Sequence, residues 1–308
     1  MKVQLDNKVM SSMTLYVDHK VCKLGEAYTN HSGYLYEAMP NYLYKDGTSN
    51  FYIYSAPHKQ LVGDVSIPGA YVSSGIYFDT SLGTSHYGAD GATGPKLYSI
   101  NHTQGHYYTR SKILLTGDGA IPRQSAQYAV KDFNVYLTSL ADEQLLFETK
   151  IELRPKVTNP TTGLSPSTQT YPAIFLRNMG ARNEPFAFGG FDDTKFNVRA
   201  VILSNNAFNL DAVCGILKDC ARDIVPLVDT SDLPFDALGG SPSGYNYTGI
   251  AAEKINSGLY LEVNDVVVSR NVTRGYTEGQ NPLIQASFVD FSLSYYRYPA
   301  EDSPKLVG

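Results

Sequence analysis

Two histidines four residues apart, His102 and His106, are the nearest pair of side chains that could hold a metal ion. On a helix this spacing would place both rings on one face. Gly105 lies between them and two tyrosines follow His106, which favours a hairpin that keeps the rings apart. We therefore expect no metal site, and no motif in the sequence predicts a bound cofactor.

Paired carboxylates in an aromatic-lined cleft could hydrolyse a glycoside, because that reaction needs two acids about 5 to 10 Å apart. Asp192 and Asp193 are adjacent, and Asp64 is a further candidate acid. Two aspartates between phenylalanine-containing segments are first of all typical of a turn. The possible nucleophile Cys214 falls in an apolar helical stripe, and no G-x-S-x-G motif occurs. The sequence therefore predicts a protein that is not an enzyme.

Residues 197–228 have the strand, helix, strand order that can place a phosphate at a helix N-terminus. The turn at residues 204–209 has side chains where a phosphate-binding loop has glycines, and no G-x-x-x-x-G-K-[ST] motif is present. We therefore expect no nucleotide site.

The composition narrows the class of protein further. A chain of 308 residues is long enough for about two domains or one large β fold. With 43% hydrophobic and 18% charged residues it is not a disordered chain. The 25 basic residues are scattered among 30 acidic ones, so we expect no direct, sequence-specific nucleic-acid binding. No run of about 18 apolar residues occurs, so we expect no membrane span.

The residues that must form the fold are strand and turn formers, with 24 Tyr and 13 Phe beside 26 Gly and 16 Pro. The sequence predicts a mainly β, α+β fold with antiparallel sheets in two regions. A polar connection at residues 117–127 separates residues 1–120 from residues 121–308. An N-terminal helix and one internal helix complete the prediction, the second packed on the second sheet.

Region 1–120 begins with an amphipathic helix over residues 6–24, whose apolar stripe includes Val9, Met13 and Tyr16. The stripe can pack on its own domain or on a neighbouring subunit, and periodicity does not distinguish the two. Five to seven short strands should follow over residues 26–116, including those at residues 34–36, 51–54, 70–72 and 76–78.

Region 121–308 should be α+β. Period-two alternation predicts a β-hairpin formed by residues 133–137 and 145–153. The internal helix is expected at residues 209–222, with Asn209 as cap and a hydrophobic staple between Phe208 and Val213. Further strands are predicted at residues 173–177, 185–188, 196–204, 223–228, 259–269 and 286–298.

Three long segments are poor in core residues and are candidate contact loops: residues 83–94, 155–172 and 233–247. Tyrosine suits such a surface because its ring buries apolar area while the hydroxyl keeps a polar partner. The candidate interface residues are Val9, Met13, Tyr16, His86, Tyr87, Tyr245 and Tyr247.

Several segments resemble virion structural proteins of tailed bacteriophages. The likeness spans most of the chain and consists of packing and turn patterns without a reacting group. The segments are SAPHKQLV at residues 55–62, KDFNVYLT at 131–138, LLFET at 145–149, PFAFGG at 185–190 and NLDAVC at 209–214.

The resemblance implies a component of the phage particle, most simply in the neck or tail as a connector, tail terminator or tail-associated ring. It implies as partners copies of the same chain in a homo-oligomeric ring and other virion proteins of the neck, tail or portal side. We expect synthesis in the host cytoplasm, since residues 1–10 lack the apolar run of a secretory signal, and assembly into the virion. The alternative is a host-surface glycan-binding module of a baseplate or receptor-binding protein.

Overall fold

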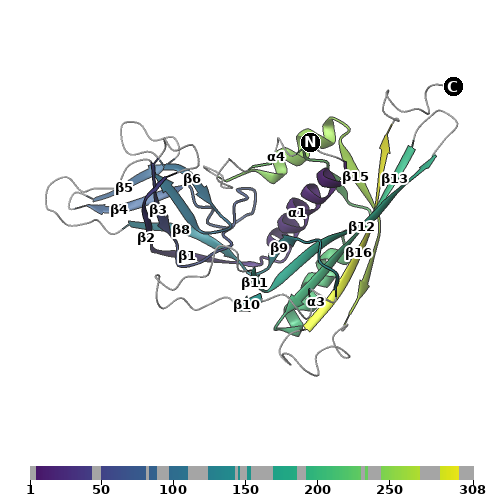
Figure 1. The fold of residues 1–308 in the computed structure, drawn as a ribbon, viewed down its shortest axis with the longest axis horizontal. Coiled ribbons are helices and arrows are strands. Elements are labelled where there is room, and N and C mark those ends of the chain that lie inside the picture. Colours follow the sequence, from purple (N-terminus) through teal and green to yellow (C-terminus); the bar gives the residue numbers. More distant parts are fainter. Residues whose placement is uncertain are drawn as a thin grey trace.

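Two lobes, each built around β-sheets, lie along the long axis of the molecule (Figure 1). The computed structural model describes residues 5–43, 50–80, 83–88, 97–109, 124–142, 145, 151–153, 169–185, 192–229, 233–234, 244–270 and 285–297. The predicted fold class is confirmed: the chain is mainly β with antiparallel sheets in both lobes, an N-terminal helix, and an internal helix on the second sheet.

The first lobe is a sandwich of two four-stranded antiparallel sheets. One sheet has the order β1 (Tyr28–Tyr34), β8 (Gln124–Lys131), β4 (Gly75–Thr80), β5 (Gly83–Gly88). The other has the order β2 (Tyr36–Leu43), β3 (Asn50–Ser55), β7 (His106–Thr109), β6 (Leu97–Asn101). Side chains from both sheets form one core, in which the buried tyrosines Tyr54, Tyr107 and Tyr128 are the largest side chains.

The second lobe contains a six-stranded sheet. Its order is β14 (Ile224–Pro226), β15 (Tyr260–Ser269), β16 (Gln285–Arg297), β13 (Asp192–Ser204), β12 (Ala173–Pro185), β9 (Asn134–Leu137). All neighbours are antiparallel except β9 and β12, which run parallel. A separate parallel pair is formed by β10 (Ile151–Leu153) and β11 (Gln169–Tyr171). Helices α1 (Leu5–Leu24) and α3 (Ala207–Lys218) cover one face of the large sheet, and α4 (Tyr247–Asn256) lies above α1 (Figure 1).

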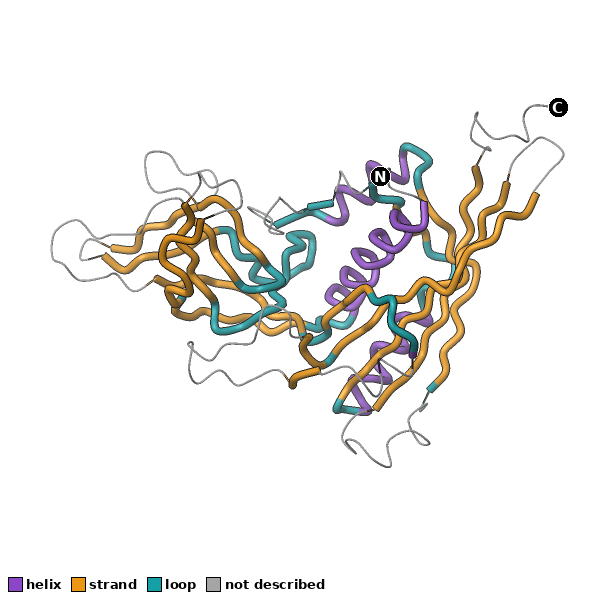
Figure 2. The backbone as a smooth tube through the Cα atoms, in the orientation of Figure 1, coloured by secondary structure: helices purple, strands orange, loops and turns teal. Residues whose placement is uncertain are grey.

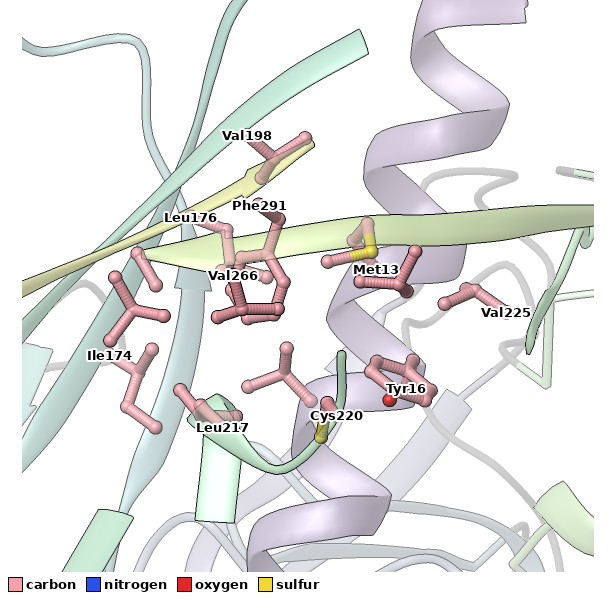
Figure 3. Packing of buried hydrophobic residues seen from close by; sticks show 14 of the residues in the cluster. Met13, Tyr16, Ile174, Leu176, Val198, Leu217, Cys220, Val225, Val266 and Phe291 are labelled. Carbon is pink, nitrogen blue, oxygen red and sulfur yellow. The ribbon is translucent and has the colours of Figure 1, made fainter. Parts of the chain in front are cut away.

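Helix α1 packs on its own chain. Val9, Met13 and Tyr16 are almost fully buried in the largest core cluster, together with residues of α3 and the large sheet such as Leu217 and Phe291 (Figure 3). The sequence left open whether the apolar stripe packs on its own domain or on a neighbouring subunit, and the structure shows it packed within its own chain. The structure does not support these three as interface residues, because their side chains are covered within their own chain.

Helix α3 begins earlier than predicted. Its N-cap is Asn206, whose Oδ1 accepts a hydrogen bond from the backbone N–H of Phe208 at 2.9 Å, and not Asn209. Phe208 is 80% exposed, so the predicted staple with Val213 does not form. The helix ends at Lys218 instead of 222. Of the predicted inner stripe, Leu210, Val213, Cys214 and Leu217 are buried, whereas Ala221 lies beyond the helix and is exposed.

The predicted hairpin of residues 133–137 and 145–153 was wrong. Strand β9 instead pairs in parallel with β12, in the register Val135 to Ile174. Leu145 is buried against the opposite face of the large sheet, in a cluster with Phe175 and Val201, and β10 pairs with β11. Alternation identifies a half-buried strand but not its partner, so a pairing between distant segments was missed.

Smaller corrections concern the predicted turns and loops. Residues 70–72 form a connection without strand pairing, while residues 83–88 of the first candidate loop form β5. Asp192 and Asp193 begin β13 rather than occupying a turn. Helix α4 was not predicted. The strands expected near residues 51–54, 76–78, 196–204, 259–269 and 286–298 are confirmed.

The lobes divide the chain differently from the predicted boundary at residue 120. Strand β8 follows that boundary in sequence, yet it pairs with β1 and β4 in the first lobe. Helix α1 precedes the first lobe in sequence, yet it packs in the core of the second. Within the described ranges, no helix has the length and hydropathy needed to cross a bilayer.

Candidate functional site

A cavity of about 230 Å³ lies where the two lobes meet. Its walls come from one face of α1, the segment at residues 60–63, the turn at residues 102–103, the end of β8, strand β9, and two residues near α4. Thr103 and Leu137, which are both exposed, lie at its rim. The cavity is therefore open to solvent and combines residues that are distant in sequence.

An ion pair forms part of the cavity wall. Both carboxylate oxygens of Asp18 on α1 lie 2.7 Å from Nζ of Lys131, at the end of β8. Burial alone would lower the pKa of Lys131, but neighbouring negative charge, led by Asp18, raises it above its ordinary value. Lys131 is therefore charged at neutral pH and connects the two lobes.

A second buried pair lies beside the first. Nδ1 of His19 is 2.6 Å from Oδ2 of Asp64, and the His19 ring stacks on Tyr247 with centroids 4.4 Å apart. Oδ1 of Asp64 accepts hydrogen bonds from the backbone N–H of Tyr247 and from both the N–H and the hydroxyl of Ser66. Burial raises the pKa of Asp64, yet these hydrogen bonds hold it below its ordinary value. The pair ties α1, the segment after β3 and the start of α4 together.

The His19–Asp64 pair has the geometry of the base and orienting acid of a nucleophilic site. Its side chains are almost completely covered, and Tyr247 covers one face of the His19 ring. In this arrangement the pair is a buried contact that joins α1 to the segment after β3.

The two histidines weighed as metal ligands lie on the hairpin that the sequence predicts. His102 begins the turn between β6 and β7, and His106 begins β7. Burial lowers the pKa of His102 to about 4, and burial together with the charge of Lys59 lowers the pKa of His106 to about 4. In the described part of the chain, no three His, Cys, Asp or Glu side chains converge as they would at a metal site.

His102 lines the cavity and is only 7% exposed. Hydrogen bonds with backbone at Ser73 and Ile100 favour a proton on this ring, while Nε2 has no hydrogen-bond partner among the described residues. At neutral pH the lowered pKa therefore leaves this ring uncharged.

The candidate acids do not come together as a hydrolytic pair. Asp64 is engaged by His19 and Ser66, while Asp193 is a buried residue at the far end of the second lobe, with Oδ2 3.9 Å from Nζ of Lys195. The sulfur of Cys214 lies in the core against the large sheet.

The remaining candidate interface residues have different positions. Tyr245 lines the cavity, where a short backbone pairing with Gly63 and Val65 holds it. Tyr247 is buried and begins α4. His86 and Tyr87 lie on β5, with side chains outside the described part of the structure. Of the other two candidate loops, residues 155–168 and most of residues 233–247 also fall outside it.

Sequence reasoning did not single out Asp18, Gln60 or Lys131, which supply polar atoms to the cavity. Asp18 and Lys131 are 113 residues apart, so no local pattern marks their pairing. The only signal for Asp18 and Lys131 was that a charged residue occurs on the inner side of α1 and of β8, where apolar residues were expected.

A second feature is a ribbon at the end of the molecule away from the first lobe (Figures 1 and 2). We define the three-strand extension as residues 180–185 of β12, 192–197 of β13 and 292–297 of β16, which are paired in register; β15 runs beside β16 only as far as Ser294. Strand β9 pairs with β12 only as far as Leu176, so in the described residues the outer edge of the extension carries no strand. Gly180 to Asn183 are exposed, and Tyr296 is 40% exposed.

The outer edge of β12 is irregular. A bulge occurs between Asn178 and Gly180, where Oδ1 of Asn178 accepts a hydrogen bond from the Gly180 N–H at 2.8 Å. Arg182 and Glu184 form an ion pair at 2.9 Å, and Pro185 has no N–H. Bulges, charges and proline on an edge strand limit indiscriminate pairing.

No family model, curated protein or solved structure matches this chain. The cavity and the extension therefore carry the functional argument by themselves.

Proposed function

We propose that this chain is a non-enzymatic structural subunit of a tailed-phage virion, in the neck or tail, which contacts copies of itself in a ring and neighbouring virion proteins. The observation that carries the proposal is the three-strand extension. It projects from the lobe that holds it, and its outer edge has backbone hydrogen-bonding groups to offer (Figure 2).

A ring of identical subunits needs a projecting element and a different receiving surface on the same chain. The extension supplies the first of these. Met179, at the bulge, adds exposed apolar surface near the outer edge, and Tyr296 adds it on β16, at the other side of the extension. Because the bulge, the charges and Pro185 disfavour indiscriminate pairing, this edge suits one matching partner better than open-ended aggregation.

The covered side chains agree with a structural role. Within the described residues, the polar groups with catalytic potential, His19, Asp64 and Lys131, are engaged in contacts that join the lobes. Such contacts stiffen a subunit that must transmit force between neighbours.

The proposal is tested first by the oligomeric state of the purified chain across a range of concentrations, measured by native mass spectrometry and light scattering. We expect a closed oligomer. Replacing Tyr296 with Ser should weaken self-association at least tenfold, whereas Tyr71→Ser should leave it unchanged. Tyr71 is 49% exposed on the first lobe and provides the matched control.

Some ring proteins assemble only on a template, so the second measurement is made on particles. The chain should be found in purified virions, and its density should repeat around the neck or tail axis in a reconstruction. A monomeric chain that is also absent from the particles would refute the proposal.

A further inference from the structure

The cavity between the lobes has polar atoms whose hydrogen-bonding capacity is not used. Nζ of Lys131 has three N–H donors, and Asp18 accepts from at most two of them. Gln60 donates through Nε2 to the Tyr136 hydroxyl at 3.1 Å, which leaves its carbonyl oxygen as an acceptor. Nε2 of His102 also has no partner among the described residues, but it is covered. The cavity therefore presents at least one donor and one acceptor.

The charges at the cavity cancel. Asp18 and Lys131 neutralise each other, and His102 is uncharged at neutral pH. A buried charge that loses its partner is strongly destabilising, so an ionic ligand that competes for either partner would be disfavoured. The polar groups therefore suit a neutral ligand with several hydroxyls.

The rest of the wall is mostly apolar. Leu15, Val135 and Leu233 line the cavity together with the rings of Tyr136 and Tyr245, whose hydroxyls lie 3.1 Å from Nε2 of Gln60 and 3.5 Å from Oδ2 of Asp18. A ring with hydroxyls at its edge and C–H groups on its face matches a wall that combines a few polar atoms with aromatic and aliphatic groups.

The size of the cavity sets the size of the ligand. Sites for drug-sized molecules have volumes of about 300 to 1,000 Å³, so a cavity of about 230 Å³ fits a smaller molecule. Gly63 contributes to this space, because a Cβ atom there would lie 3.3 Å from both the His102 and the Tyr245 rings. A larger residue would push these rings from their positions.

We propose that this cavity binds one neutral sugar ring, with Lys131 donating to a hydroxyl, Gln60 accepting from another, and Tyr245 packing against the apolar face. The inference does not depend on the proposed place of the chain in a virion.

The test uses the full chain and saturation-transfer NMR with glucose, galactose and N-acetylglucosamine as probes, followed by titration calorimetry. We expect saturable binding of at least one of the three. Gluconate and glucosamine, which carry opposite charges, should bind at least tenfold more weakly than the matching neutral sugar. The His102 ring nitrogen signals should shift when the sugar binds.

Two variants locate the site. Leu137→Trp fills the exposed rim and should abolish binding, and Gln60→Leu removes the acceptor and should weaken it at least tenfold. Gln104→Leu is the matched control, because Gln104 is a neighbouring amide that does not line the cavity. Circular dichroism and thermal unfolding check that each variant folds.

Absence of saturable binding by all three neutral sugars would overturn the proposal, as would binding that persists in a folded Leu137→Trp variant. Equal affinity for a charged analogue would also overturn it. The sugar ring could be a free sugar or the end of a longer glycan, and a glycan array distinguishes the two. Binding on the array means that a glycan end reaches the cavity, whereas a free sugar competes for the cavity in either case. Failure of this inference leaves the ring proposal intact, because the two use different parts of the molecule.

Discussion

Acidification from about pH 7 to about pH 5 should destabilise this protein, and His102 should account for much of the effect. The ordinary pKa of histidine is 6.5, and burial lowers the pKa of His102 to about 4. The folded state therefore excludes a proton that the unfolded state binds. Stability is complete above about pH 6.5 and falls as the pH approaches 4.

The size of the effect follows from the two pKa values. Each pH unit between them costs about 1.4 kcal/mol, which limits the total to about 3 kcal/mol and gives about 2 kcal/mol between about pH 7 and pH 5. His106, which is partly exposed, contributes in the same direction with a smaller effect. The pKa of Asp64 is lowered from its ordinary value of 3.8, so Asp64 affects the free energy of unfolding only below this pH range.

The assay is urea unfolding of the wild type and of His102→Gln at both pH values. The variant should lose about 2 kcal/mol less than the wild type on acidification, because glutamine does not titrate. Gln104→Leu should retain the wild-type loss. If wild type and His102→Gln lose the same free energy of unfolding, the assignment of the proton to His102 is wrong.

Three further predictions concern stability and are measured by urea unfolding at neutral pH. Met13→Ala should cost about 2 to 5 kcal/mol, because it opens a cavity beside fully buried neighbours, whereas the exposed Phe208→Ser should change stability by less than about 0.5 kcal/mol; equal effects would contradict the packing of α1. Lys131→Met should cost about 3 to 5 kcal/mol by leaving Asp18 unpaired, and adding Asp18→Leu should restore part of the loss; additive losses would contradict the pairing. Gly105→Ala should prevent stable folding of the first lobe, because φ is +68° and the new Cβ would lie 2.2 Å from a backbone carbonyl oxygen; an unperturbed variant would refute this turn geometry.

The sequence predicted those helices and strands whose positions follow from the spacing of apolar residues along the chain. The apolar stripe of α1 and the inner stripe of α3 follow from a 3.6-residue period, and the long strands β13, β15 and β16 follow from alternation. Helix α4 was missed because only Tyr247 is buried in it, so it has no stripe to detect. Its N-cap was a usable signal, since Asn246 accepts from the backbone N–H of Gly249.

Pairings between distant segments were not predictable from one sequence. The partner of β9 lies almost 40 residues away in β12, beyond the segment that the alternation pattern suggested. The cavity depends on Asp18, Gln60 and Lys131 meeting, and each alone resembles an ordinary surface residue. The chemistry of the candidate site therefore became visible only with the tertiary structure.

The position of α1 affects the order in which the molecule can form. Its apolar stripe leaves the ribosome early, but the cluster that covers it includes Phe291 and Leu293, which are made almost three hundred residues later. Until β16 is synthesised, this stripe lacks part of its cover and is exposed to aggregation or chaperone capture. A nascent chain arrested before β16 should therefore be held by chaperones through its first helix, even when the first lobe is already folded.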